Sequence, residues 1–88
     1  MKSKYIFQKM ELDDSIFAVP VGEMSYELHA VLNVNEEAMR ILELLQEDCS
    51  EQDIVSQLLK EYIVSEEELQ SLVHSFIEQL RQEGILEE

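Results

Sequence analysis

This 88-residue chain is poor in the residue types that most enzymes and metal sites need. Its one cysteine, Cys49, excludes an internal disulfide and fits a reducing compartment. Two glycines in the whole chain are too few for a glycine-rich phosphate loop. The two histidines, His29 and His74, form no metal-ligand motif with the cysteine. We therefore expect no catalytic residues, no metal site and no cofactor in this chain.

Basic residues are also few. Six lysines and arginines stand against twenty acidic residues, which gives a formal net charge of −14. Residues 1–22 carry equal numbers of basic and acidic residues, so residues 23–88 carry the whole excess. Such a surface repels nucleic-acid phosphates and anionic membranes. No apolar run is long enough for a signal peptide or a membrane span. We expect a cytoplasmic protein that binds neither nucleic acid nor membrane.

The hydrophobic residues, 45% of the chain, predict a folded protein, and the length predicts a single domain over residues 1–88. Apolar patterns predict strands over residues 5–10, 16–19 and 28–34. Because the connections are short, we expect an antiparallel meander with the second strand in the middle. The second strand is an unbroken apolar run, which predicts that both of its faces are covered.

The third predicted strand lacks the residues that usually protect an exposed sheet edge. The first strand has Lys4, Lys9 and Glu11 for this purpose, whereas residues 28–34 contain neither lysine nor proline. Unpaired backbone donors and acceptors along such a strand need partners. The edge is therefore either buried by helices of the same chain or offered to a partner strand, and the sequence leaves both readings open.

Three amphipathic helices are expected after the sheet, the first over about residues 36–46. Asn35, Ser50 and Ser65 are expected to cap the first, second and third helices. Each serine has an acidic residue three positions later, Asp53 or Glu68, in a capping-box arrangement. These elements predict an α+β fold: a winged helix-turn-helix with an N-terminal three-stranded antiparallel sheet followed by a three-helix bundle.

The third helix carries a wide apolar stripe. Six of its residues are apolar: Leu69, Leu72, Val73, Phe76, Ile77 and Leu80. One contact with a core needs a narrower stripe than this. Either all six residues belong to the core, or part of the stripe faces a groove.

Several short motifs occur in a characteristic order. An apolar strand ends in Val34-Asn35, and the next helix carries the pair Leu44-Leu45. The remaining matching positions are Ile54, Leu58, Tyr62, Val73, Phe76, Ile77, Leu80, Gly84, Ile85 and Leu86, with a Phe17-Ala18-Val19-Pro20-Val21-Gly22 segment before them. In these positions the chain resembles the PqqD-like family, the peptide-binding recognition elements of pathways that modify ribosomally made peptides. Where this family often has Asp just before the valine of the last helix, this chain has Leu72.

The resemblance implies that the third strand accepts a leader peptide as an extra strand, with leader side chains in a groove beside the last helix. It predicts peptide binding by Leu28, His29, Ala30, Val31, Leu32, Asn33, Leu69, Leu72 and Phe76. The implied partners are a precursor peptide and a modifying enzyme, commonly a radical S-adenosylmethionine enzyme. The chain itself would not be an enzyme.

Two other classes of protein compete with this interpretation. Asp14-Ser15-Ile16 resembles the attachment motif of acyl carrier proteins, but here the serine introduces a strand-like run instead of a mid-chain helix. An acidic winged helix could also be an interaction or regulatory module that binds no leader. A DNA-binding version would need basic residues along the third helix, which has only Arg81.

Overall fold

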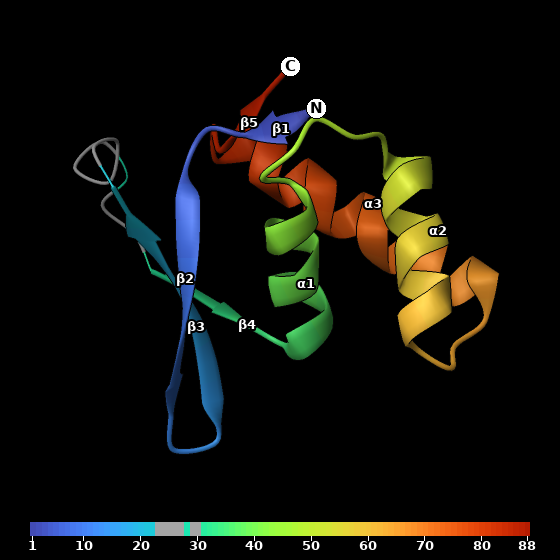
Figure 1. Cartoon of the computed structure of the whole chain (residues 1–88), viewed down its shortest axis with the longest axis horizontal. Helices are drawn as coiled ribbons and strands as arrows, with labels where there is room; N and C mark the ends of the chain where they lie inside the picture. The colour runs from blue at the N-terminus through green and yellow to red at the C-terminus, as the bar shows by residue number, and fades with distance from the viewer. Residues whose placement is uncertain (23–27, 29–30) are drawn as a thin grey trace.

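The computed structural model describes residues 1–22, 28 and 31–88, and it contains a small sheet and a group of helices (Figure 1). The elements in chain order are β1 (Lys2–Ser3), β2 (Ile6–Leu12), β3 (Ser15–Val21), β4 (Leu32–Val34), α1 (Glu36–Leu44), α2 (Glu51–Glu61), α3 (Glu66–Gln82) and β5 (Leu86–Glu87). The predicted α+β fold, with a three-stranded antiparallel sheet before three helices, is confirmed.

The three-stranded sheet has the order β2-β3-β4, and both pairs are antiparallel. The second predicted strand is therefore central, as expected. β2 and β3 form a hairpin in which Leu12 pairs with Ser15 across a two-residue turn. Asp13 in this turn has φ 57°, a conformation that aspartate tolerates better than most residues. The hairpin extends beyond the helices at its turn end (Figure 1).

β4 is much shorter than the strand predicted over residues 28–34. Only Leu32–Val34 are in the strand; Leu28 and Val31 lie outside it. β3 ends its pairing with β4 at Ala18, opposite Leu32. The next residue of β3 on that side is Pro20, which has no N–H to donate to a further pair. The apolar pattern of residues 28–34, from which the longer strand was predicted, contains no information about Pro20 on the neighbouring strand.

The helices begin at the predicted caps. The Asn35 side chain accepts a hydrogen bond from the Ala38 N–H at 2.8 Å. Ser50 and Asp53 form both bonds of a capping box, at 3.0 and 3.1 Å. At α3 the hydroxyl of Ser65 accepts from the N–H of the third helical residue, and the described contacts contain this half of the predicted box only.

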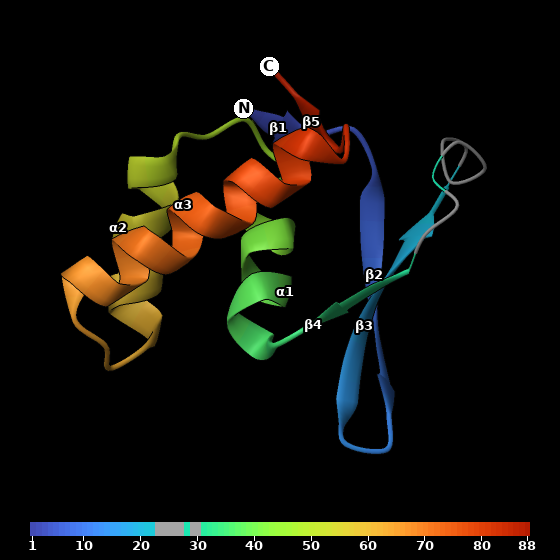
Figure 2. The same cartoon turned by 180° about the vertical axis from the view of Figure 1, so that it is seen from behind.

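One hydrophobic core joins the sheet and the helices. Its fully buried side chains are Ile41, Leu42, Leu45, Ile54, Leu58, Val73, Ile77, Leu80 and Ile85. α3 crosses in front of α1 in the view of Figure 2, and α2 packs at the end far from the sheet. After α3, Gly84 (φ 72°) allows the N–H groups of Gly84 and Ile85 to bond back to the carbonyls of Arg81 and Leu80.

The turn at Gly84 also creates a pairing that the sequence did not predict. It directs the chain into β5, where Ser3 pairs with Leu86 in an antiparallel two-residue ladder with β1. Both chain ends therefore lie together beside the end of α3 (Figure 1).

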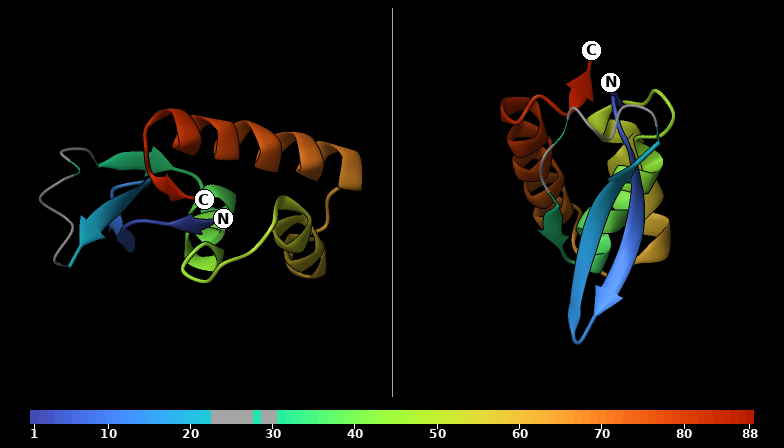
Figure 3. Two further views of the ribbon diagram at one scale, coloured as in Figure 1. Left: turned by 90° about the horizontal axis from the view of Figure 1, so that it is seen from above. Right: turned by 90° about the vertical axis from the view of Figure 1, so that its left-hand side faces the viewer.

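Only one face of the sheet is covered by helices, with the hairpin in front and the helices behind it (Figure 3). The inner face holds Phe7 and Ala18, both buried, and the partly buried Leu32 and Val34. The opposite face, here called the outer face, is formed by Ile6, Met10, Leu12, Phe17, Val19 and Val21. The prediction that residues 16–19 are covered on both faces holds only in part: helices cover the inner face alone, and Phe17 and Val19 on the outer face are partly buried.

Candidate functional site

β4 is one of the two edge strands of the sheet, and the turn between β2 and β3 determines which of its backbone groups point outward. Residues that flank a two-residue turn form a hydrogen-bonded pair, and such pairs alternate along an antiparallel ladder. Leu12 and Ser15 flank the turn, so odd-numbered residues of β3 bond to β2 and even-numbered residues bond to β4. Leu32 pairs with Ala18, so its N–H faces β3, and the N–H of Asn33 faces outward.

A groove lies beside this edge. It is a hollow of about 300 Å³ between β4, the first turn of α1 and α3. Its lining residues are Val31, Leu32, Asn33, Val34, Asn35, Ala38, Phe76 and Gln79. Phe76 is partly buried and packs against the core, so the α3 wall of the groove is held in place.

A second hollow, here called the recess, has a volume of about 240 Å³. It is lined by Asn35, Glu37, Tyr62, Val64, Glu68, Leu69 and Leu72. Asn35 borders both the groove and the recess. Phe76 in the groove and Leu72 in the recess are four residues apart on α3, which is about one helical turn. The two hollows therefore follow each other along one side of α3.

The recess combines apolar walls with an acidic rim. Leu72 and Val64 expose 37% and 41% of their surfaces, so apolar atoms are available to a ligand. Glu37 and Glu68 contribute carboxylates to the same lining. Burial, together with the charge of Glu37, raises the pKa of Tyr62, so its phenol stays a neutral hydrogen-bond donor. The site favours an apolar side chain next to a basic one.

The predicted strand residues fall at different places around this site. Val31, which is 56% exposed, and Leu32 line the groove together with Asn33. Leu28 is partly buried and packs against the core. His29 and Ala30 lie outside the residues that the structure describes.

The predicted residues of the last helix also separate. Phe76 lines the groove and Leu72 lines the recess. Leu69 is only 3% exposed and belongs to the core, although it reaches the floor of the recess. The structure thus brings Val31, Leu32 and Phe76 together at one groove, with Leu72 a helical turn away.

The sequence analysis missed several lining residues. Gln79 lies three positions after Phe76, so the helical period was a usable signal for it. Ala38, in the first turn of α1, also lines the groove. Tyr62 and Val64 come from the end of α2 and the connection to α3, and only the tertiary structure places them beside Leu72.

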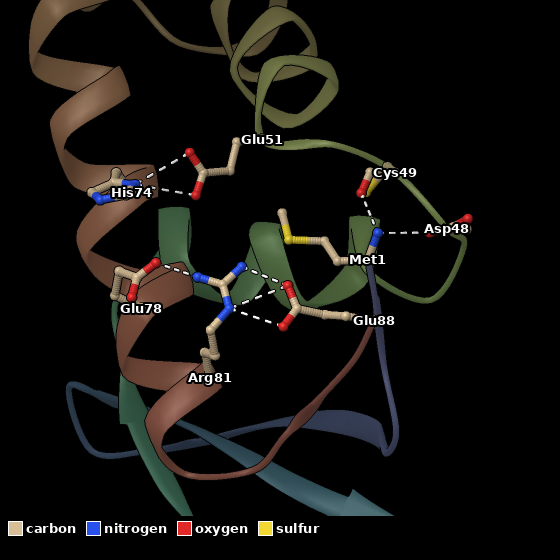
Figure 4. A network of polar contacts seen from close by, with 8 residues as sticks. All are labelled: Met1, Asp48, Cys49, Glu51, His74, Glu78, Arg81 and Glu88. Carbon is tan, nitrogen blue, oxygen red and sulfur yellow. Dashed lines mark hydrogen bonds and ion pairs between the residues drawn. The ribbon is translucent and has the colours of Figure 1, made fainter.

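A separate polar network joins α2, α3 and the two chain ends (Figure 4). His74 Nδ1 lies 3.2 Å from a carboxylate oxygen of Glu51, and Arg81 contacts both Glu78 and Glu88. Glu51, His74 and Glu78 offer ligand atoms within 4.8 Å of one another. We assign no metal site to this exposed group, because Glu51 already faces His74 and Arg81 already compensates Glu78.

Comparison with known proteins identifies the family. Residues 24–86 match the family described as "Coenzyme PQQ synthesis protein D (PqqD)". The chain belongs to the PqqD family. The predicted resemblance is therefore confirmed, and the match includes β4, the groove and the recess. No match is found among curated proteins.

A solved structure shows the same fold as this PqqD-family chain. It is described as "TbiB1 in Complex with the TbiA(beta) Leader Peptide", and the similarity has a TM-score of 0.70. The alignment covers 99% of this chain and 95% of that chain, at 21% sequence identity. At this identity the likeness concerns the fold alone. Among the described residues, no helix has both the length and the hydropathy that crossing a membrane requires.

Proposed function

We propose that this chain binds the leader segment of a ribosomally made precursor peptide as an additional strand along β4. The observation that carries the proposal is the outward-facing N–H of Asn33 beside a groove with Phe76 on its opposite wall. Backbone hydrogen bonds to the β4 edge would hold the peptide, and the groove would select its side chains. Membership of the PqqD family and the fold shared with a leader-bound protein support this proposal.

The spacing of the two hollows fits an extended peptide. Side chains two residues apart in a strand are separated by about 6.6 Å and point to the same side. Phe76 and Leu72 are separated by about one helical turn, a similar distance. A leader with two apolar side chains two residues apart would fill the groove and the recess. A neighbouring basic residue would meet Glu37 and Glu68.

The role of the chain is binding, with chemistry left to a partner. It would present the precursor to a modifying enzyme such as a radical S-adenosylmethionine maturase, and it would not itself be an enzyme. Of the predicted binding residues, Val31, Leu32, Asn33, Leu72 and Phe76 keep this assignment, whereas Leu28 and Leu69 pack with the core. Residues 1–88 would act as one peptide-binding domain in the cytoplasm, where precursor peptides are made and a lone thiol such as Cys49 stays reduced.

Single proline substitutions test the edge directly, because proline removes one backbone donor. In Asn33→Pro the lost N–H points outward, so the protein should remain folded and its affinity for the leader should fall at least about tenfold. In Leu32→Pro the lost N–H faces β3, so the free energy of unfolding should fall by about 2 kcal/mol or more. Circular dichroism measures folding, and fluorescence anisotropy of a labelled synthetic leader measures binding.

Two control variants complete the experiment. Lys9→Pro removes an outward-facing N–H from the opposite sheet edge, on β2, and should leave leader binding unchanged. Asn33→Ala removes the exposed side chain but keeps the N–H, and should also bind normally. Normal leader binding by folded Asn33→Pro protein would rule out recognition through β4.

A further inference from the structure

The outer face of the sheet is strongly apolar. Residues opposite each other in the β2–β3 ladder share a face, and four such pairs belong to it: Ile6 with Val21, Gln8 with Val19, Met10 with Phe17 and Leu12 with Ser15. Gln8 and Ser15 are the polar members of these pairs. Ile6, Met10 and Leu12 expose 58%, 52% and 61% of their surfaces. Water therefore contacts these three side chains of β2, while Phe17, Val19 and Val21 beside them on β3 are partly buried.

The sequence of β3 makes this exposure unusual. A strand with one solvated face normally alternates apolar and polar residues, whereas a continuous apolar run is typical of a strand covered on both sides. β3 carries such a run, and the helices cover its inner face only (Figure 3). Phe17 and Val19 point to the other side, where no helix covers them and both are partly buried. Larger exposed apolar patches of this kind mark interaction sites.

A second copy of the chain is a poor occupant for this face. Each copy carries a net charge of −14, so association brings strong repulsion. The exposed part of the six side chains amounts to a few hundred Å² at most, below the roughly 800 Å² per partner that a stable interface buries. A stable partner must therefore gain further contacts outside this face.

The proposed leader strand would supply those contacts. A strand added to β4 continues the same sheet, and every second side chain of that strand then points to the outer face. A protein on the outer face would touch both the chain and the bound peptide. β2 and β3 lie within residues 1–22, the part with no net charge, so an apolar partner meets little electrostatic cost there.

We propose that the outer face is the docking surface for the enzyme that modifies the bound precursor peptide. This inference rests on the proposed function, because the footprint of the enzyme includes the leader strand. The docking surface of the enzyme is apolar, with uncharged or basic residues at its rim that tolerate the acidic remainder of the chain. Leader and enzyme binding are coupled: each ligand raises the affinity for the other by the same factor.

The test uses the full chain, the modifying enzyme encoded beside the precursor gene, and a synthetic leader peptide. The double variant Ile6→Thr/Met10→Thr removes apolar surface, keeps the net charge and retains residues that favour strands. Its affinity for the enzyme, measured by biolayer interferometry, should fall at least about tenfold. Its affinity for the leader alone, measured by fluorescence anisotropy, should stay within about twofold. Addition of leader should strengthen enzyme binding by the wild-type chain, because the bound leader adds contacts with the enzyme.

The control variant is Ile63→Thr, which removes an exposed isoleucine from the α2–α3 connection, away from the sheet. It should bind the enzyme normally. The inference is overturned if the double variant binds the enzyme as tightly as wild type, or if the control loses as much affinity. It is also overturned if sedimentation velocity shows a wild-type dimer that the double variant abolishes, because a second copy then occupies the face. If the wild-type chain does not bind the leader at all, that result contradicts the proposed function instead.

Discussion

At the scale of single residues, the best-defined polar contact links α1 to the end of α2. The guanidinium of Arg40 donates two hydrogen bonds to the Glu61 carboxylate, at 2.8 and 2.9 Å. The side-chain amide of Gln57 donates a third, at 2.8 Å. These donors, Arg40 first, lower the pKa of Glu61 to about 2. Both ion-pair partners remain partly exposed, so the stabilisation is modest.

Arg40→Gln should lower stability in a pH-dependent way. The pKa of Glu61 is lower in the folded protein than its ordinary value of 4.5, so ionised Glu61 stabilises the fold when the pH is above 4.5. This stabilisation is lost as the pH falls toward 2. The variant should therefore be less stable than wild type by about 0.5–1 kcal/mol near neutral pH, and the difference should vanish near pH 2. Urea unfolding across this pH range measures the effect. The control Lys9→Gln, which removes an exposed pair with Glu11, should change little; a pH-independent Arg40→Gln defect would contradict the assignment.

At the scale of elements, α3 separates its apolar residues into a core row and a groove side. Val73, Ile77 and Leu80 are fully buried and Leu69 nearly so. Leu72 and Phe76 occupy the neighbouring row, together with Gln79, and line the two hollows. The sequence already implied that at most one row could be centred on the core. The wide stripe therefore serves two surfaces, one inside the protein and one open to a ligand.

Leu72→Asp should separate binding from folding. Leu72 is 37% exposed, and the PqqD-like family that the sequence resembles often has Asp at this position. The free energy of unfolding should therefore fall by only about 1 kcal/mol. Affinity for the leader should fall on the order of tenfold, since the recess loses an apolar wall and gains a charge beside Glu68. Thermal unfolding and peptide anisotropy measure the two effects.

The matched control for this prediction is Ser71→Asp. It adds the same charge one residue earlier, at an exposed position that lines neither hollow, and should leave leader binding unchanged. A collapse of the thermal transition in Leu72→Asp would show that Leu72 belongs to the core, where an unpaired charge is strongly destabilising.

At the scale of the whole molecule, charge is divided unevenly. β1, β2 and β3 belong to the part with no net charge, whereas β4 and all three helices belong to the part that carries −14. The acidic rim of the recess lies in the second part. An acidic surface around a binding groove attracts basic ligands and accelerates their association.

Association of the leader should therefore slow as ionic strength rises. Screening shortens the range of the attraction from roughly 30 Å at 0.01 M salt to about 8 Å at physiological salt. Stopped-flow fluorescence with the labelled leader measures the association rate constant across this range. A rate constant that does not change with salt would show that the acidic residues serve solubility only.

Much of the fold was predictable because its determinants are local. The period of two in the strands, the period of 3.6 in the helices and the caps Asn35, Ser50 and Ser65 each depend on a few consecutive residues. The central place of β3 followed from short connections. Helical spacing predicted that the apolar stripe of the last helix is wider than a core contact needs, and the resemblance to the PqqD-like family placed the candidate site on this helix.

The tertiary structure decided the features that depend on distant segments. The length of β4 depends on Pro20, the β1–β5 ladder joins the two chain ends, and Tyr62 and Val64 complete the recess from another connection. The outer face shows the same division. The composition of β3 made both of its sides apolar, but whether a side is covered depends on what lies opposite it in space. Here the helices cover one side, and on the other side Phe17 and Val19 are partly buried without a helix over them.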